Sequence, residues 1–302
     1  MNKIYQIFGL NIESAIPLPA SSIAATPSEI LPDVIIAYGE VPDQLANPQS
    51  KGVRYQAAQG EFLLRVDSVA RYFVSKGRSI LIAPEPGAEE ERILIFLMGS
   101  AMGALLHQRN LLVLHAGAIE VNGRSVLFCG HSGVGKSTLA AGFHKRGYPF
   151  LADDVCAVGM FDGKPSVIPG FPRLKLWADV LKKLDKDKDQ LKKVRWTQGL
   201  EKYFLPVEPL HKSPVVLQSL FVLGTTNTDK IEITALKGGE KINPIINNTY
   251  RLHFLNGLGG KKEHFRQCAA VAAKAAVYRA VRPKGHFLLD ELMDMTEARF
   301  LS

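Results

Sequence analysis

The chain has 302 residues, and 46 % of them are apolar, which is enough to form the core of one large domain or two smaller ones. Its formal net charge is +8, but lysines and aspartates intermix along residues 182–193, as in a solvated helix or loop. No basic segment is interleaved with aromatic residues in the manner of single-strand binders, so we expect no nucleic-acid partner and favour an anionic protein or peptide.

Targeting and membrane segments are not expected. The most apolar stretch, residues 93–106, is too short to span a bilayer and reads as a buried helix. The first residues lack the long apolar segment of a signal peptide, and three cysteines give no even-numbered disulfide framework. We therefore expect a cytoplasmic protein without a membrane partner.

The first part of the chain predicts a β-rich unit. Short alternating apolar runs, separated by Pro, Gly and Ser clusters, continue to residue 87. Residues 84–87 break this pattern, and residues 89–109 then have helical spacing with acidic residues in the first turn. We expect a smaller β-rich N-terminal domain over 1–87 and a second domain over 88–302.

A β-hairpin is predicted next. Residues 111–121 and 124–129 read as strands joined by the two-residue turn Asn122-Gly123. In that register Val121 faces Arg124, and His115 lies opposite Gly130. His115 is therefore a candidate site residue, although a buried core histidine is the alternative.

The segment after the hairpin matches the phosphate-binding loop pattern G-x-x-x-x-G-K-[ST] between a predicted strand and a predicted helix. Glycines let the backbone N–H groups approach a phosphate chain, the lysine neutralises the outer phosphates, and the serine hydroxyl offers a ligand to Mg²⁺. A glycine-rich turn that binds nothing is the alternative. The expected nucleotide-binding residues are Gly130, His131, Ser132, Gly133, Val134, Gly135, Lys136, Ser137 and Thr138, with ATP and Mg²⁺ as cofactors.

Two carboxylates interrupt the apolar strand predicted over 149–158, which follows a helix over 137–145. Burying the adjacent Asp153 and Asp154 is costly unless cations or hydrogen bonds compensate, and a Mg²⁺-nucleotide site would do so. Neighbouring strand residues point to opposite faces, so both can serve one site only at a strand end or bend. We expect one near the metal and the other near the incoming nucleophile; the alternative is a pair that caps a turn.

Residues 114–117, the loop 130–137 and residues 146–154 together resemble the catalytic domain of the HPr kinase/phosphorylase family. The resemblance extends over about residues 100–302. It implies an α/β fold with a P-loop-containing kinase core of the HPr kinase and phosphoenolpyruvate carboxykinase type, which transfers phosphate from ATP to a serine hydroxyl. Relatives of this type are often oligomeric, so self-association is expected.

The resemblance also implies roles. Asp153 would be the general base, Asp154 and Ser137 would hold Mg²⁺, and the two aspartates could be exchanged. His115 would support the aspartates or the transferring phosphoryl group, and Lys136 would absorb developing charge.

Residues 167–177 depart from the family's glycine-rich segment, so we expect a divergent kinase rather than one acting on HPr. The chain is compatible with the subgroup that phosphorylates a lasso-peptide precursor. Two alternatives stay open: a kinase of a small-metabolite hydroxyl, and a nucleotide-binding regulator without turnover.

Basic residues outside the loop are candidates for binding substrate. Arg173 alternates with Lys175 on one face of a predicted strand, and Arg251 lies in an apolar neighbourhood, where an arginine needs an anionic partner. Structural ion pairs are the alternative for both. Residues 257–262 read as a basic glycine-rich loop, either a plain surface loop or one that closes over substrate.

Overall fold

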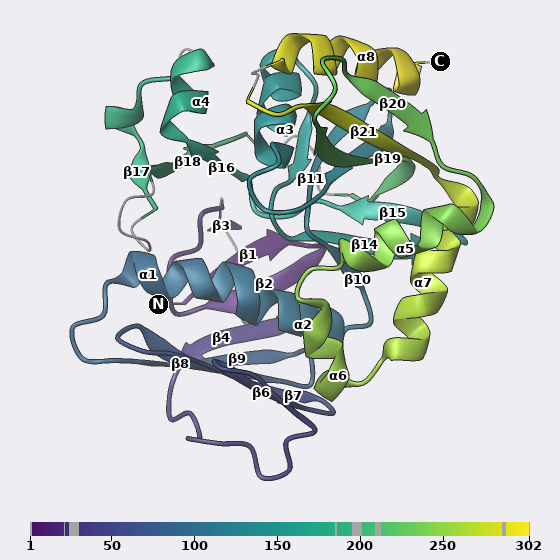
Figure 1. Ribbon diagram of the computed structural model, residues 1–302. Helices are drawn as coiled ribbons and strands as arrows, with labels where there is room; N and C mark the ends of the chain where they lie inside the picture. Colours follow the sequence, from purple (N-terminus) through teal and green to yellow (C-terminus); the bar gives the residue numbers. More distant parts are fainter. Residues whose placement is uncertain are drawn as a thin grey trace. The chain divides into compact units, whose positions relative to one another are not determined.

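The computed structural model describes residues 2–20, 22–23, 30–184, 186–194, 201–208, 213–285 and 288–301. The chain divides into two compact units, both of mixed α/β structure (Figure 1). Unit 1 comprises Met1–Val113 and Tyr250–Phe265, and unit 2 comprises Leu114–Thr249 and Arg266–Ser302. This division differs from the boundary expected near residue 88, because two later segments belong to the N-terminal unit.

Unit 1 is built on a sheet in which nine strands are described, in the order β3-β1-β2-β4-β9-β8-β7-β6-β5. The pairs β2–β4 and β4–β9 are parallel, and the other pairs are antiparallel. In β8 every second side chain is buried, so one face of the sheet packs on the core. The strands are β1 (Lys3–Ile7), β2 (Leu10–Ser14), β3 (Ser22–Ile23), β4 (Val34–Tyr38), β5 (Ser50–Lys51), β6 (Tyr55–Ala58), β7 (Glu61–Val66), β8 (Ala70–Ser75) and β9 (Ser79–Pro84).

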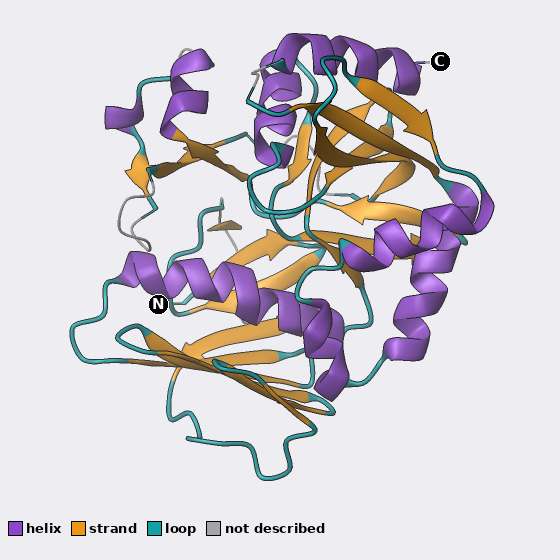
Figure 2. Cartoon of the chain, viewed as in Figure 1, coloured by secondary structure: helices purple, strands orange, loops and turns teal. Residues whose placement is uncertain are grey.

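A helical run follows this sheet and packs on it (Figure 2). It consists of α1 (Glu90–Phe96), a π-helical turn η1 (Leu97–Ala101) and α2 (Met102–Gln108), which together confirm the helix predicted over 89–109. The buried Tyr72 hydroxyl donates to the Ile93 carbonyl at 2.9 Å, and Gln108 Nε2 donates to the Val74 carbonyl at 3.2 Å. These contacts place the run in the N-terminal unit.

The second segment of unit 1 contains η4 (Leu252–Phe254), α6 (Leu255–Leu258) and the start of α7 (Lys261–Lys274). The Phe254 ring lies 4.4 Å from the Phe62 ring, centroid to centroid. Gly257 approaches β6 so closely that an added Cβ would lie 2.4 Å from the Ala57 carbonyl oxygen. The loop expected over 257–262 is therefore reduced to Gly259 and Gly260, between two helices.

Buried His107 makes the stability of unit 1 depend on pH. Its Nε2 lies 2.9 Å from the Tyr250 carbonyl and donates to it, and burial lowers the pKa of His107 to about 4. In the unfolded chain a histidine pKa is about 6.5. Below that pH the unfolded chain takes up the proton first, so the free energy of unfolding falls by about 1.4 kcal/mol per pH unit until pH nears the folded value.

We expect His107→Gln, whose amide can also donate to the Tyr250 carbonyl, to remove this contribution. Denaturant unfolding of the wild type and the variant between pH 7 and 4.5 measures it. The two proteins should differ in the slope of stability against pH below about 6.5. Parallel curves would show that His107 does not titrate in this way.

Unit 2 is built on a second sheet, whose main path runs β10-β14-β15-β19-β12-β11-β13 and whose β19 also pairs with β21. The pairs β12–β19 and β19–β21 are parallel, and β20 pairs antiparallel with β21. The strands are β10 (Leu112–Leu114), β11 (Ala116–Val121), β12 (Arg124–Cys129), β13 (Phe150–Ala152), β14 (Cys156–Phe161), β15 (Lys164–Ile168), β19 (Val215–Thr226), β20 (Glu232–Ala235) and β21 (Ala276–Pro283).

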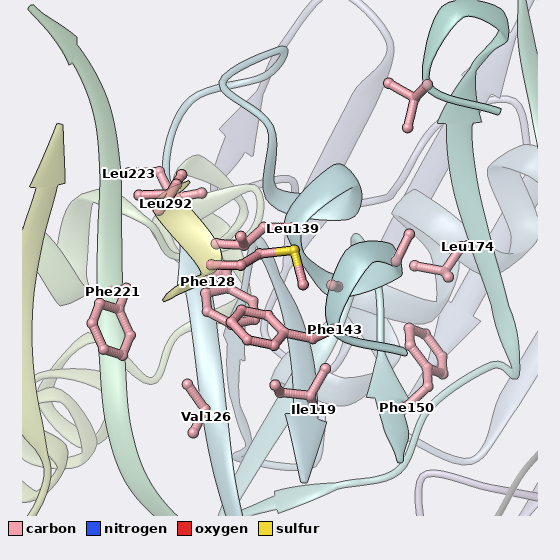
Figure 3. Packing of buried hydrophobic residues seen from close by; sticks show 14 of the residues in the cluster. Ile119, Val126, Phe128, Leu139, Phe143, Phe150, Leu174, Phe221, Leu223 and Leu292 are labelled. Atoms are coloured by element: carbon pink, nitrogen blue, oxygen red, sulfur yellow. The ribbon is translucent and has the colours of Figure 1, made fainter. Parts of the chain in front are cut away.

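Two helices cover the central strands of this sheet. Helix α3 (Lys136–Lys145) packs on β11 and β12 and contacts α8 (Leu289–Leu301). Figure 3 shows the buried side chains between them: the Phe128 ring stacks on Phe143 at 5.5 Å, and Phe221 lies 6.1 Å from Phe128. This aromatic core packs α3 against β12, and the glycine-rich loop joins these two elements.

A smaller sheet in unit 2 has the order β16-β18-β17, formed by β16 (Arg173–Trp177), β18 (Lys202–Pro206) and β17 (Lys192–Lys193). Leu174 and Leu176 are buried in the same core as Phe128, so alternate residues of β16 point to the other face. The charged run 182–193 contains the end of α4 (Ala178–Lys183), the 3₁₀ turn η2 (Lys188–Gln190) and β17. Asp185 lies outside the described residues. The remaining elements are η3 (Gly238–Lys241) and α5 (Ile242–Asn247).

Candidate active site

The loop of residues 130–137 joins β12 to α3, so the strand and the helix predicted on either side of it are confirmed. Gly130 has φ +140°, and a Cβ there would lie 2.8 Å from the Leu223 carbonyl oxygen, which excludes a side chain. Gly135 has φ +114° and is the residue before the helix. The first N–H groups of a helix have no partner within it and attract anions. The loop therefore ends in an anion-binding position.

Lys136 carries the positive charge of this loop. Its side chain is buried, and its Nζ donates to the carbonyls of Gly130 at 2.9 Å and His131 at 3.1 Å. Burial lowers the pKa of Lys136, and the nearby Asp154 and Asp153 act in the opposite direction. The ammonium is held over the loop, and its charge interacts with those of the two aspartates.

The two aspartates lie in a break between β13 and β14, where a single strand over 149–158 was predicted. The strand breaks because β13 pairs with β11 whereas β14 pairs with β15. Asp154 adopts φ +71°, a left-handed conformation that is uncommon for a residue with a side chain. The bend lets both carboxylates take part in one cluster, which was the condition for a shared site.

Asp153 is held by neutral donors. The Ser137 hydroxyl donates to its Oδ1 at 2.8 Å, and the backbone N–H of Lys175 donates to its Oδ2 at 3.0 Å. Burial and the neighbouring Asp154 raise the pKa of Asp153, while these two hydrogen bonds lower it. Thus Asp153 is the carboxylate beside the hydroxyl that was expected to hold Mg²⁺.

Asp154 is held by a histidine and a lysine. His115 Nδ1 lies 3.0 Å from its Oδ1, and Lys175 Nζ lies 3.5 Å from its Oδ2. Burial alone would raise the pKa of Asp154, but Lys175, His115 and Lys136 together hold it well below its usual range. About a third of the side chain remains exposed, so Asp154 is ionised and accessible.

The hairpin register predicted for His115 is confirmed as far as its neighbour. Val121 pairs with Arg124, and Ala116 pairs with Cys129, the residue before Gly130. His115 itself lies between β10 and β11, and its backbone N–H donates to the Asn248 carbonyl at 2.8 Å. The short break in the strand turns the imidazole towards Asp154.

The small sheet contributes a face of cationic and aromatic side chains. Lys175 pairs with Phe204 and Trp177 pairs with Lys202, and the side chains of directly paired residues share a face. Lys202 Nζ lies 4.3 Å from the Trp177 ring centroid, and the Arg173 guanidinium lies 4.1 Å from that of Phe204. Burial lowers the pKa of Arg173 to about 10, against the influence of Asp154 and Asp153.

A cavity of about 380 Å³ lies beside the loop. Its lining combines loop and helix backbone with apolar side chains of β16, α4 and α8 and with one cation: Gly133, Val134, Gly135, Thr138, Leu139, Trp177, Asp179, Val180, Arg282, Leu288, Leu289 and Leu292. A concave apolar pocket with a few polar groups is typical of a small-molecule site. The aromatic ring of Trp177 and the backbone of the glycine-rich loop both line this cavity.

Not every expected residue joins this cluster. Arg251 belongs to unit 1, where its guanidinium lies 5.7 Å from the Tyr250 ring centroid. The substrate-binding role of Arg251 remains a prediction, and Arg251 is not part of the cluster in unit 2. The sequence analysis missed Lys202, because its place depends on the pairing of β16 with β18. It also missed Trp177, which lines the cavity together with residues of the loop, α4 and α8.

Comparison with known proteins finds distant likenesses among solved structures only. Neither a scan against protein-family models nor a search of curated proteins finds a match. Among solved structures the chain resembles the Hpr(Ser) kinase/phosphatase from Coxiella burnetii, with a TM-score of 0.33 and 14 % sequence identity. The match covers 63 % of this chain and 90 % of that chain. A likeness at this level does not assign a family.

None of the helices in the described ranges combines the length and the apolar composition needed to cross a membrane.

Proposed function

We propose that the protein is a Mg²⁺-ATP-dependent kinase that transfers the γ-phosphate to a serine hydroxyl of a protein or ribosomally synthesised peptide. One arrangement supports this above all: the loop lysine and serine lie beside two carboxylates, one in contact with the loop serine and the other with a histidine and a lysine. Positioning and charge stabilisation carry most of the catalysis of phosphoryl transfer.

The residues at the loop fit a nucleotide. Gly133 and Gly135 have positive φ, and a Cβ added to either would meet nothing within 4 Å, so their backbones are open to a ligand. Lys136 would hold the outer phosphates, and the cavity lined by Trp177 would take the base. Arg282, the cation in the cavity lining, adds a second positive charge beside the loop.

The residues also fit the metal ion that accompanies a nucleotide. A group of three or more His, Cys, Asp or Glu side chains that could hold an ion alone does not occur in the described part of the chain. Mg²⁺ bound with phosphates needs only one or two protein oxygens. Ser137 and Asp153, joined by a 2.8 Å hydrogen bond, offer these oxygens, and the bound ion would neutralise developing negative charge.

We propose that Asp154 is the general base, which accepts the proton of the acceptor hydroxyl. This assignment exchanges the roles that the sequence resemblance implied for the two aspartates. Asp153 is engaged by Ser137 and by the Lys175 N–H, whereas Asp154 is partly exposed and held in place by His115 and Lys175. Asp154 would orient the acceptor hydroxyl and take its proton as the oxygen–phosphorus bond forms and ADP departs. Lys175 and His115 lower the pKa of Asp154 and keep it ionised, so it can accept a hydrogen bond from the acceptor hydroxyl, and in a loose transition state the proton leaves late.

The acceptor class follows from the sequence resemblance over residues 114–154. A serine on a peptide such as a lasso-peptide precursor is the acceptor we propose, and self-association is proposed on the same basis. A fold alone does not fix a substrate, so the acceptor needs a direct test.

The test is to follow the γ-phosphate. The protein is incubated with γ-labelled ATP, Mg²⁺ and candidate peptides encoded beside its gene, and the label is located by mass spectrometry. We expect label on a peptide serine and none when EDTA removes Mg²⁺. Label on a small-molecule hydroxyl would replace the peptide kinase with a metabolite kinase. Tight ATP binding without transfer to any acceptor would point to a regulator.

A further inference from the structure

Strand β16 places three long side chains in line on one face of the small sheet. Trp177 lines the cavity beside the loop, Lys175 reaches Asp154, and Arg173 comes next in the same direction. Residues two apart on a strand share a face and are separated by about 6.6 Å. Along β16 the order is therefore Trp177 at the cavity, Lys175 at the carboxylate of Asp154, and then Arg173.

Arg173 packs on two aromatic rings, and the two aspartates act on its charge without touching it. Its guanidinium lies 4.1 Å from the Phe204 ring centroid and 5.9 Å from that of Phe171. Within the described residues it forms no ion pair and no side-chain hydrogen bond, although it is partly buried. A buried guanidinium is favourable only when its planar set of N–H donors finds acceptors, and carboxylates match that set best.

The anion that Arg173 would bind belongs to the phosphate acceptor rather than to the nucleotide. Arg173 is not part of the cavity lining, which takes in Trp177 at the other end of the strand. The phosphates of a nucleotide would lie at Lys136 and the helix N-terminus, and Lys175 separates these groups from Arg173 along β16. Along β16, Arg173 thus lies on the side of Lys175 that is away from Trp177 and the cavity.

We propose that Arg173 binds a carboxylate of the acceptor peptide, within about two residues of the serine, so that the kinase selects acidic acceptors. The distance follows from strand geometry, because about 6.6 Å separates Arg173 from Lys175 along the chain and an extended peptide covers that distance in two residues. This inference rests on the proposed function and names the substrate class of the same site.

Equilibrium binding tests it without requiring phosphoryl transfer. Fluorescent peptides, acetylated and amidated, carry serine followed by aspartate or by asparagine, and binding is measured with and without a non-hydrolysable ATP analogue. We expect the wild type to bind the aspartate peptide about 10- to 100-fold more tightly. A third peptide, which ends in a free carboxylate after serine and asparagine, tells whether a terminal carboxylate serves as well.

Variants assign the preference to one residue. Arg173→Gln should abolish the preference for aspartate, and Arg173→Lys should retain part of it. Lys193→Gln is the matched control, because it removes one charge from the same sheet at a position paired with buried Tyr203, on the opposite face. Its preference should stay at the wild-type value. Thermal melts check that each variant is folded.

The outcomes separate this inference from the proposed function. An equal aspartate preference in wild type and Arg173→Gln, or no binding of any peptide, overturns the inference. So does a loss of ATP affinity in Arg173→Gln with peptide binding unchanged, which would assign Arg173 to the nucleotide. Arg173-dependent peptide binding without transfer of label would support the carboxylate-binding role of Arg173 and contradict the kinase function. Equal transfer to neutral and acidic peptides would support the kinase function and contradict the role of Arg173.

Discussion

We expect Asp154→Asn to lower the rate of phosphoryl transfer by about 10²- to 10⁴-fold, the range for loss of a general base. The amide keeps the size of the side chain but cannot accept the hydroxyl proton, and it loses the charge that pairs with His115 and Lys175. Single-turnover transfer of labelled phosphate to the peptide serine measures the effect. ATP affinity should change little, because Asp153 rather than Asp154 contacts the loop serine.

Asp153→Asn is the companion variant. It should raise the Mg²⁺ concentration needed for half-maximal rate, since Asp153 lies at 2.8 Å from the Ser137 hydroxyl. A reversed pattern, with the Mg²⁺ dependence altered by Asp154→Asn and the rate at saturating Mg²⁺ abolished by Asp153→Asn, would restore the first assignment of the base to Asp153. Transfer at the wild-type rate in both variants would show that neither aspartate is the general base.

Lys136→Met should lower the transfer rate by about 10²- to 10³-fold, the cost of removing one donor that stabilises transition-state charge in a site sheltered from water. The methionine keeps an apolar stem for the buried position but cannot neutralise phosphate oxygens. Its kcat and its affinity for ATP are measured by the same label transfer and by nucleotide titration.

The control for this variant is Lys145→Met, at the other end of the same helix and exposed. It removes the same charge from α3 and should behave as wild type. If Lys136→Met and Lys145→Met transferred phosphate equally well, the loop would have no part in catalysis, whatever its sequence.

Local sequence rules predicted the parts of the site that neighbouring residues determine. Asn122-Gly123 fixes a two-residue turn, so the register of its strands and the place of His115 follow by counting. The glycine pattern from Gly130 to Gly135 predicts a strand-to-helix loop because few other residues tolerate its backbone angles. Alternation likewise placed Arg173 and Lys175 on one face of β16.

Features that depend on distant pairing were not predictable in this way. The break at Asp153 and Asp154 arises because β13 and β14 have different partner strands, which a single apolar run does not reveal. Lys202 reaches the site only through the register of β18 with β16. The helical run 90–108 carries no local sign that it packs on the strands before it rather than on those after it. Long-range contacts decided each case.

The return of residues 250–265 to unit 1 has a consequence for synthesis on the ribosome. Phe254 and Gly257 fill places against β6 and β7 that the first 113 residues cannot fill themselves. During translation the N-terminal sheet therefore keeps an uncovered apolar surface while residues 114–249 are made, which takes roughly ten to thirty seconds at usual elongation rates. A nascent chain of this protein offers chaperones a binding surface that the finished chain conceals.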